Sequence, residues 1–170
     1  HRDPRLHDVT VSLGAELLVL AKIVKDAKSA RAQLERALAS GEAAERFQRM
    51  VTALGGPRDF MENAGGHLPK APIIRPVLAK KAGKIAVIAT RDLGVAVIEL
   101  GGGRRVASDR IDHAVGLTAL AGKGKVLAKG EPLAMIHARD EASFERAAAI
   151  VQKAYALGAA PRKTPAVIEH

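Results

Sequence analysis

ATRDLGVAVIELGGGRR, at residues 89–105, holds the clearest local signals in the chain. The apolar run Ile85–Ile88 just before it predicts a buried strand, because several consecutive apolar residues fit a strand covered on both faces. Thr90 is the expected N-cap of a helix ending at Leu100, with Asp92 in the first turn near the positive helix end. The glycines at 101–103 stop that helix, since glycine takes positive φ without strain.

Beyond this helix the pattern predicts short strands and one more helix. Strands are expected at Val115–Leu117 and, after two glycine-containing turns, at Leu133–Ile136. A helix is predicted over Asp140–Leu157, with Asp140 as its N-cap and Gly158 closing it. A last strand is expected at Thr164–Ile168. Residues after the glycine run therefore mix strands with helices.

Ahead of residue 68 the chain reads as helical throughout. Apolar residues three and four apart predict helices over Pro4–Leu20, Lys28–Leu38 and Glu42–Leu54, followed by one helical turn over Asp59–Asn63. Asp3 is the expected N-cap of the first helix, with Pro4 at its first position, where a missing N–H costs nothing. The first helix has apolar residues around much of its surface, so it needs partners on more than one side.

Three prolines between residues 69 and 76 mark a connector. Pro69, Pro72 and Pro76 exclude a helix or a central strand, which leaves an edge-like strand at Ile73–Leu78. We place the domain boundary there. The prediction is an α+β chain, with a helical segment over residues 1–68 and a separate domain over residues 69–170.

The composition limits the possible classes of protein. With 170 residues and 48% hydrophobic residues the chain can build a core, and with only 2% aromatic residues that core must be made of Ala, Val, Leu and Ile. The absence of cysteine excludes disulfides, thiolate metal sites and thiol nucleophiles. No apolar run reaches the roughly 18 residues of a membrane span. A cytoplasmic protein is the expectation.

A net charge of +9 raises the possibility of a nucleic-acid-binding protein, because lysine and arginine neutralise phosphates. The basic residues are however spread along the chain and alternate with acidic ones. Side chains that could stack on bases are few, namely Phe47, Phe60, Phe144 and Tyr155. We therefore expect a solvated basic surface and keep nucleic-acid binding as an alternative.

A search for reactive groups assigns no catalytic, substrate-binding, cofactor-binding or metal-binding residue. The histidines have no i, i+4 pair or H-E-x-x-H pattern, which argues against a metal site. The glycine run Gly101–Gly103 follows a helix and would present carbonyls, so a helix end is favoured over an anion site. Arg104 and Arg105 are expected to be solvated or to bridge Asp109 or Asp112. His113 and His137 are expected to be structural.

Three separated motifs carry a family resemblance. They are DPRLHDVT at residues 3–10, TRDLGVAVIELGGGRRVASDRIDHAVG at residues 90–116 and GEPLAMIHA at residues 130–138. In this order they resemble the C-terminal part of the pyrimidine nucleoside phosphorylases, and overall the chain is most similar to the bacterial members that act on thymidine. The resemblance covers essentially the whole chain.

The resemblance implies a fold and a place in a larger protein. Residues 69–170 would form the family's α/β-hammerhead C-terminal domain, and residues 1–68 would be the last helices of its large central α/β domain. The chain opens with His1 and moves at once into a helix, so we expect it to be a C-terminal fragment.

The family catalyses reversible phosphorolysis of a pyrimidine nucleoside, which gives the base and a pentose 1-phosphate. The resemblance implies inorganic phosphate as co-substrate, no organic cofactor and a homodimeric whole enzyme. The family's K-H-S-T-G-G phosphate loop and its base-binding arginine, serine and lysine lie upstream, and no such string occurs here. We therefore expect a structural part that is inactive alone and has the missing N-terminal part as its partner.

A carrier module is the other alternative. The spacing of glycine, valine and proline over Val115–Ala138 resembles the hairpins of biotinyl and lipoyl carrier domains. Those domains show a modified lysine at a hairpin tip, usually between methionines. Met135, the only methionine nearby, is predicted to lie within a strand, which argues against a carrier.

Overall fold

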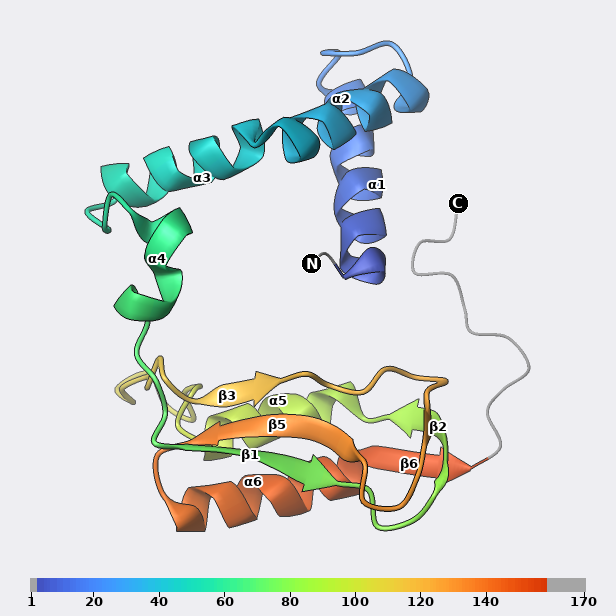
Figure 1. Cartoon of the computed structure of the whole chain (residues 1–170), viewed down its shortest axis with the longest axis vertical. Helices are drawn as coiled ribbons and strands as arrows, with labels where there is room; N and C mark the ends of the chain where they lie inside the picture. Colours follow the sequence, from blue (N-terminus) through green and yellow to red (C-terminus); the bar gives the residue numbers. More distant parts are fainter. Residues whose placement is uncertain (1–2, 159–170) are drawn as a thin grey trace. The chain divides into compact units, whose positions relative to one another are not determined.

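In a computed structural model of the chain, which describes residues 3–158, the chain forms two compact units, over residues 3–67 and 68–158 (Figure 1). The first unit is entirely helical, and the second combines two small antiparallel sheets with two helices. The predicted α+β class is confirmed. Each unit is described by itself.

The first unit contains α1 (Pro4–Leu20), α2 (Ala27–Ser40), α3 (Glu42–Ala53) and α4 (Phe60–His67). As predicted, Asp3 caps α1: its carboxylate accepts a hydrogen bond of 2.8 Å from the N–H of Leu6. Asp26 caps α2 in the same way through Ser29. A side-chain acceptor at this position satisfies an N–H that has no partner within the helix.

Polar side chains join α1 to α2. His7 Nε2 lies 2.9 Å from Glu35 Oε1, while Arg31 donates to Asp8 at 3.1 Å and to Ser12 at 2.6 Å. The apolar contact between the two helices is small, with only three buried hydrophobic residues in the unit: Val11, Ala15 and Ala30. The unit is therefore held by polar contacts as much as by a core.

Large apolar side chains remain exposed on this unit. They include Leu6, Leu13, Leu17, Leu20, Ile23, Phe47, Met50 and Leu54. Leu17, in the last turn of α1, is 66% exposed. An apolar surface of this extent on one small unit is typical of a face that another element covers.

The second unit has two three-stranded sheets. One has the order β1 (Ile73–Leu78), β5 (Pro132–Ala138), β3 (Gly116–Thr118), and the other β4 (Val126–Leu127), β2 (Gly83–Ile88), β6 (Tyr155–Gly158). All pairings are antiparallel. Two helices, α5 (Thr90–Glu99) and α6 (Glu141–Ala154), pack on each other, and α6 also packs on β5 and β1 (Figure 1).

The core of this unit is made of small and branched aliphatic side chains. Ile136 from β5, Ala96 from α5 and Ala147 from α6 are all fully buried. Burial is uneven along β2: Ile85 is 0% exposed, whereas Val87, which follows an irregularity in the pairing with β6, is 55% exposed. The prediction of a fully buried strand over Ile85–Ile88 is therefore wrong.

Three further predictions differ from the structure or lie outside it. The last helix ends at Ala154, and residues 155–158 form β6 instead of the helix end predicted at Leu157. The N-cap of α5 is Ala89, without a side-chain hydrogen bond, and Thr90 is the first helical residue. The strand expected at Thr164–Ile168 lies outside the described residues.

The connector and its strand agree with the prediction. β1 spans Ile73–Leu78 and lies at the edge of its sheet, paired only with β5. Pro76 sits within it, opposite Met135. Between residues 3 and 158, no helix combines the length and apolar character required to span a bilayer.

Candidate functional site

The glycines after α5 form a helix end of the Schellman type. Gly101 has φ of 91°, and its N–H bonds to the carbonyl of Ile98 at 2.9 Å. The N–H of Gly102 reaches the carbonyl of Val97, also at 2.9 Å. These two bonds satisfy carbonyls that the helix leaves free. The predicted role of the glycines as a helix end is confirmed.

Two aspartates then hold the loop that follows. Asp109 Oδ2 accepts hydrogen bonds from the N–H groups of Arg105 at 2.9 Å and Val106 at 3.1 Å. These hydrogen bonds hold the pKa of the Asp109 carboxyl below its usual value, because they favour its charged form. The N–H of Val106 has the larger effect and that of Arg105 the smaller one. The N–H of Asp112 donates to the carbonyl of Gly101 at 2.9 Å and draws the loop back to the helix end.

The arginines have other partners than the sequence suggested. The guanidinium of Arg105 pairs with Glu99 in the last turn of α5, and Arg146 of α6 lies 3.8 Å from the same carboxylate. Arg104 donates from Nε to the main-chain carbonyl of Asp109 at 3.1 Å. Both arginines are exposed, as one alternative predicted. The other alternative, a bridge to the carboxylate of Asp109 or Asp112, is wrong, because Asp109 uses its carboxylate to order the backbone.

Asp112 is paired with an arginine far away in sequence. Arg139 donates to it through Nε at 2.8 Å and through Nη2 at 2.7 Å, a two-pronged arrangement that fits a carboxylate well. The N–H of Ala114 donates to Asp112 at 2.9 Å. Both contacts lower the pKa of Asp112, and the hydrogen bond from Ala114 has a larger effect than the one from Arg139. This pair ties the loop to the segment between β5 and α6.

Replacing Asp112 with Asn should lower the free energy of unfolding of the second unit at neutral pH by about 0.5–1 kcal/mol, the range of a partly exposed ion pair. Because the folded-state pKa of Asp112 is lowered, its stabilising effect is fully present above the ordinary value of 3.8 and is lost as the pH falls through the folded value. Urea unfolding of both proteins at neutral pH and well below pH 3.8 checks this. An equal difference at both pH values would contradict it.

A cavity of about 460 Å³ lies beside this loop. The end of α5, the loop and the start of α6 line it, with four arginines around it: Arg105, Arg110, Arg139 and Arg146. Glu99, Asp109 and Asp140 line it too, so most of the positive charge is balanced. Arg110 has no ion pair among residues 3–158. Guanidinium groups can bind an anion, but the carboxylates here are engaged already: Glu99 by Arg105, and Asp109 and Asp140 by backbone N–H groups.

The histidines do not converge. His137, on β5, lies 2.8 Å from the hydroxyl of Thr118 on β3, and His113 is exposed on the loop. His67 lies 2.8 Å from Asp59, and this contact lowers the pKa of Asp59. Among the described residues no three His, Cys, Asp or Glu side chains come together as metal ligands would. That no residue of this chain is catalytic stays a prediction.

Sequence reasoning missed the residues that fix this loop. Glu99, Arg139 and Arg146 received no role, although Glu99 is the shared partner of two arginines. The sequence offered one signal for Glu99: it is an acidic residue in the last turn of a helix. A negative charge there is unfavourable next to the negative end of the helix dipole, so a nearby cation is expected. The partner Arg139 lies 27 residues from Asp112 and could not be identified without the fold.

Comparison with known proteins supports the resemblance. Residues 84–158 match the family model of the pyrimidine nucleoside phosphorylase C-terminal domain. The chain is 48% identical to a thymidine phosphorylase of Burkholderia lata over 168 residues, which are 99% of this chain and 38% of that protein. It is 51% identical to a thymidine phosphorylase of Burkholderia orbicola over 157 residues, 92% of this chain and 36% of that protein.

The matched family region coincides with the folded elements that surround the loop. It begins within β2 and ends with β6, so it includes α5, the glycine turn, the two aspartates and α6. The chain spans less than two fifths of the length of these relatives. Residues 84–158 thus match the pyrimidine nucleoside phosphorylase C-terminal domain, and the chain as a whole is similar to part of thymidine phosphorylase.

Proposed function

We propose that this chain is the C-terminal part of a thymidine phosphorylase and that its contribution to the enzyme is structural. The observation that carries the proposal is the match of 99% of the chain to 38% of a thymidine phosphorylase. The whole enzyme would convert thymidine and inorganic phosphate to thymine and 2-deoxyribose 1-phosphate. A phosphate oxygen bonds to the sugar C1′ while the glycosidic C–N bond breaks and its electrons leave with the base.

This reaction places demands that point to another part of the enzyme. Phosphate needs cationic and hydroxyl donors, and the departing base needs donors that stabilise its negative charge. The arginines beside the glycine turn are engaged instead, with Arg105 on Glu99 and Arg139 on Asp112. The upstream part would supply the catalytic groups, and this chain would help to fix the cleft that closes on both substrates.

The exposed apolar side chains support a partner for the first unit. Leu6, Leu17 and Leu20 on α1 are each exposed by more than half, although a core-forming helix would bury them. We propose that the upstream part of the same enzyme covers this face. Residues 1–68 would then belong to its central α/β domain, and residues 69–170 to its C-terminal domain.

The test is phosphate-dependent release of thymine from thymidine, followed by ultraviolet absorbance. The 170-residue chain alone should show no activity, and neither should a separately made upstream part of the Burkholderia lata relative. A mixture of the two should release thymine only when phosphate is present. Activity in the chain alone would overturn the assignment of the catalytic groups to the upstream part.

A pair of variants tests the apolar face. Leu17→Glu should abolish the activity of the mixture, because it places a charge on a surface that must be desolvated on docking. Leu17→Met, which keeps an apolar side chain of similar size, is the matched control and should retain most of the activity. Leu17 is 66% exposed, so neither change should unfold the chain alone. Full activity with Leu17→Glu would contradict docking through α1.

A further inference from the structure

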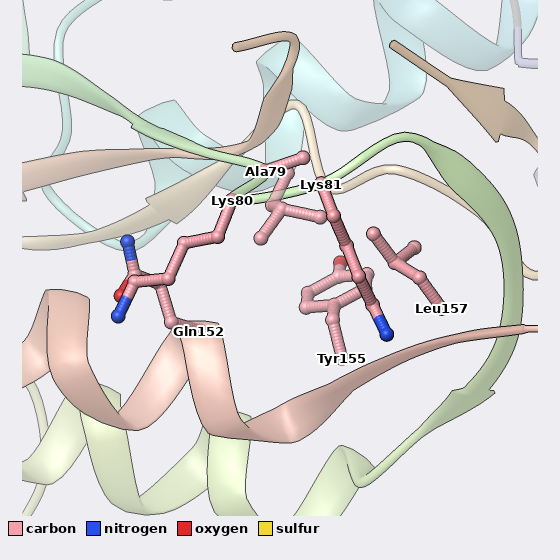
Figure 2. A pocket seen from close by; sticks show the side chains of 7 residues that line it. Ala79, Lys80, Lys81, Gln152, Tyr155 and Leu157 are labelled. Atoms are coloured by element: carbon pink, nitrogen blue, oxygen red, sulfur yellow. The ribbon is translucent and has the colours of Figure 1, made fainter. Parts of the chain in front are cut away.

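A second cavity, of about 380 Å³, shares no lining residue with the cavity beside the glycine turn. It is lined by Ala79, Lys80, Lys81, Leu133, Gln152, Tyr155 and Leu157 (Figure 2). These come from the turn between β1 and β2, from β5, and from the junction of α6 with β6. The volume lies in the lower range of small-molecule pockets.

The walls of this pocket are apolar and firmly held. Tyr155 is only 7% exposed, and its hydroxyl donates to the carbonyl of Ala121 at 3.1 Å, which fixes the ring. The N–H of Ala79 donates to the main-chain carbonyl of Glu131 at 2.8 Å, and the carbonyl of Ala79 accepts a hydrogen bond from the N–H of Gly130 at 2.9 Å. Such a pocket is formed before a ligand arrives, which reduces the entropic cost of binding.

Two uncompensated positive charges stand at its rim. Lys80 and Lys81 are exposed, and neither takes part in an ion pair within residues 3–158. Among the described residues no acidic side chain lines the pocket, and the polar side chains there besides the lysines are those of Tyr155 and Gln152. In the view of Figure 2, Lys80 and Gln152 reach one corner of the pocket, and Lys81 lies toward Tyr155 and Leu157.

We propose that this pocket binds a small carboxylate with a compact apolar body. The body would lie against Tyr155, Leu133 and Leu157, and the carboxylate would be held at the corner where Lys80 and Gln152 lie, while Lys81 adds positive charge from the other side of the pocket. An apolar pocket with a few convergent polar groups is the usual form of a small-molecule site. The proposal is independent of thymidine phosphorolysis, because it uses none of the residues around the glycine turn.

The chain contains its own reporter for this site. Tyr155 is the single tyrosine, and the chain has no tryptophan, so its intrinsic fluorescence arises almost entirely from the wall of the pocket. Titration of the whole chain with cyclohexanecarboxylate, which does not absorb where tyrosine does, should give a saturable change in emission. The uncharged analogue cyclohexanecarboxamide has the same apolar body and should bind about fivefold more weakly.

Variants separate the charge from the shape of the pocket. The double variant Lys80→Gln, Lys81→Gln should bind cyclohexanecarboxylate about fivefold more weakly than the unchanged protein does. Its affinity for the amide should be unchanged, because only the attraction between opposite charges is lost. The control, Lys28→Gln combined with Lys70→Gln, removes two charges from exposed lysines outside the pocket and should change neither.

Three results would overturn the proposal. They are the absence of a saturable change, equal binding of the carboxylate and the amide, and an equal loss of carboxylate binding in the control variant. Each can be read on the folded protein, because the substituted lysines are exposed and belong to no core contact.

Discussion

Ile85→Ala should lower the free energy of unfolding of the second unit by about 2–5 kcal/mol, the range for a large buried aliphatic residue cut back to alanine. Ile85 lies on β2 and is 0% exposed in the core that β2 shares with α5, α6 and β5. The loss combines the transfer free energy of the removed carbons with the cavity that they leave. For a unit of this size it is a large share of the total stability.

The matched control is Val87→Ala on the same strand. Val87 is 55% exposed and does not belong to the buried core, so its truncation should cost no more than about 0.5 kcal/mol. Urea unfolding followed by tyrosine fluorescence measures this unit alone, since Tyr155 is the only tyrosine of the chain. Equal losses from the two variants would contradict the difference in burial between Ile85 and Val87.

Ala147→Leu should also destabilise the second unit, by about 1–3 kcal/mol, because it forces extra carbons into a filled space. Ala147 on α6 and Ala96 on α5 are both fully buried in the same core, and the two helices pack on each other. With so few aromatic residues in the chain, the core depends on close approach of its helices, and alanine permits that approach.

Ala149→Leu, two residues further along α6, makes the same chemical change at an exposed position. Leucine and alanine differ little in helix propensity, so the expected change is within about 0.5 kcal/mol. A thermal unfolding midpoint for each protein gives the comparison. A stable Ala147→Leu protein would mean that the core around Ala147 can take extra carbons without loss.

Local signals were sufficient wherever they were strong. The spacing of leucines in Pro4–Leu20 and the cap at Asp3 predicted α1 with its observed bounds. Three prolines predicted the edge strand Ile73–Leu78 equally well. In both cases the residues that determine the element lie within it or next to it, so no knowledge of the fold was needed.

The end of α6 shows where such reasoning fails. Val151, Ala154 and Tyr155 are spaced as on one helical face, so the pattern continues past the true end at Ala154. What ends the helix is a distant partner: Tyr155 pairs with Ile88 of β2. Strand pairing across 67 residues leaves no trace in a short window, and tertiary contacts override local propensity.

The candidate site was predictable only in part. The glycines were correctly expected to end a helix, because the conformation that they adopt is a local matter. The partners of Arg105 and Asp112 were not, since Arg105 reaches back over a turn to Glu99 and Asp112 reaches Arg139 in another segment. Side-chain pairs of this kind depend on how elements meet in space.

Pro76 on β1 also affects how the protein behaves in a crowded solution. An edge strand presents N–H and C=O groups with which a strand of another molecule could pair, the first step toward fibrils. β1 is such an edge in the described sheet, and Pro76 lies near its middle. Proline has no N–H to donate and disrupts a continuous ladder. The residue that marks β1 as an edge strand thus also protects it against self-association.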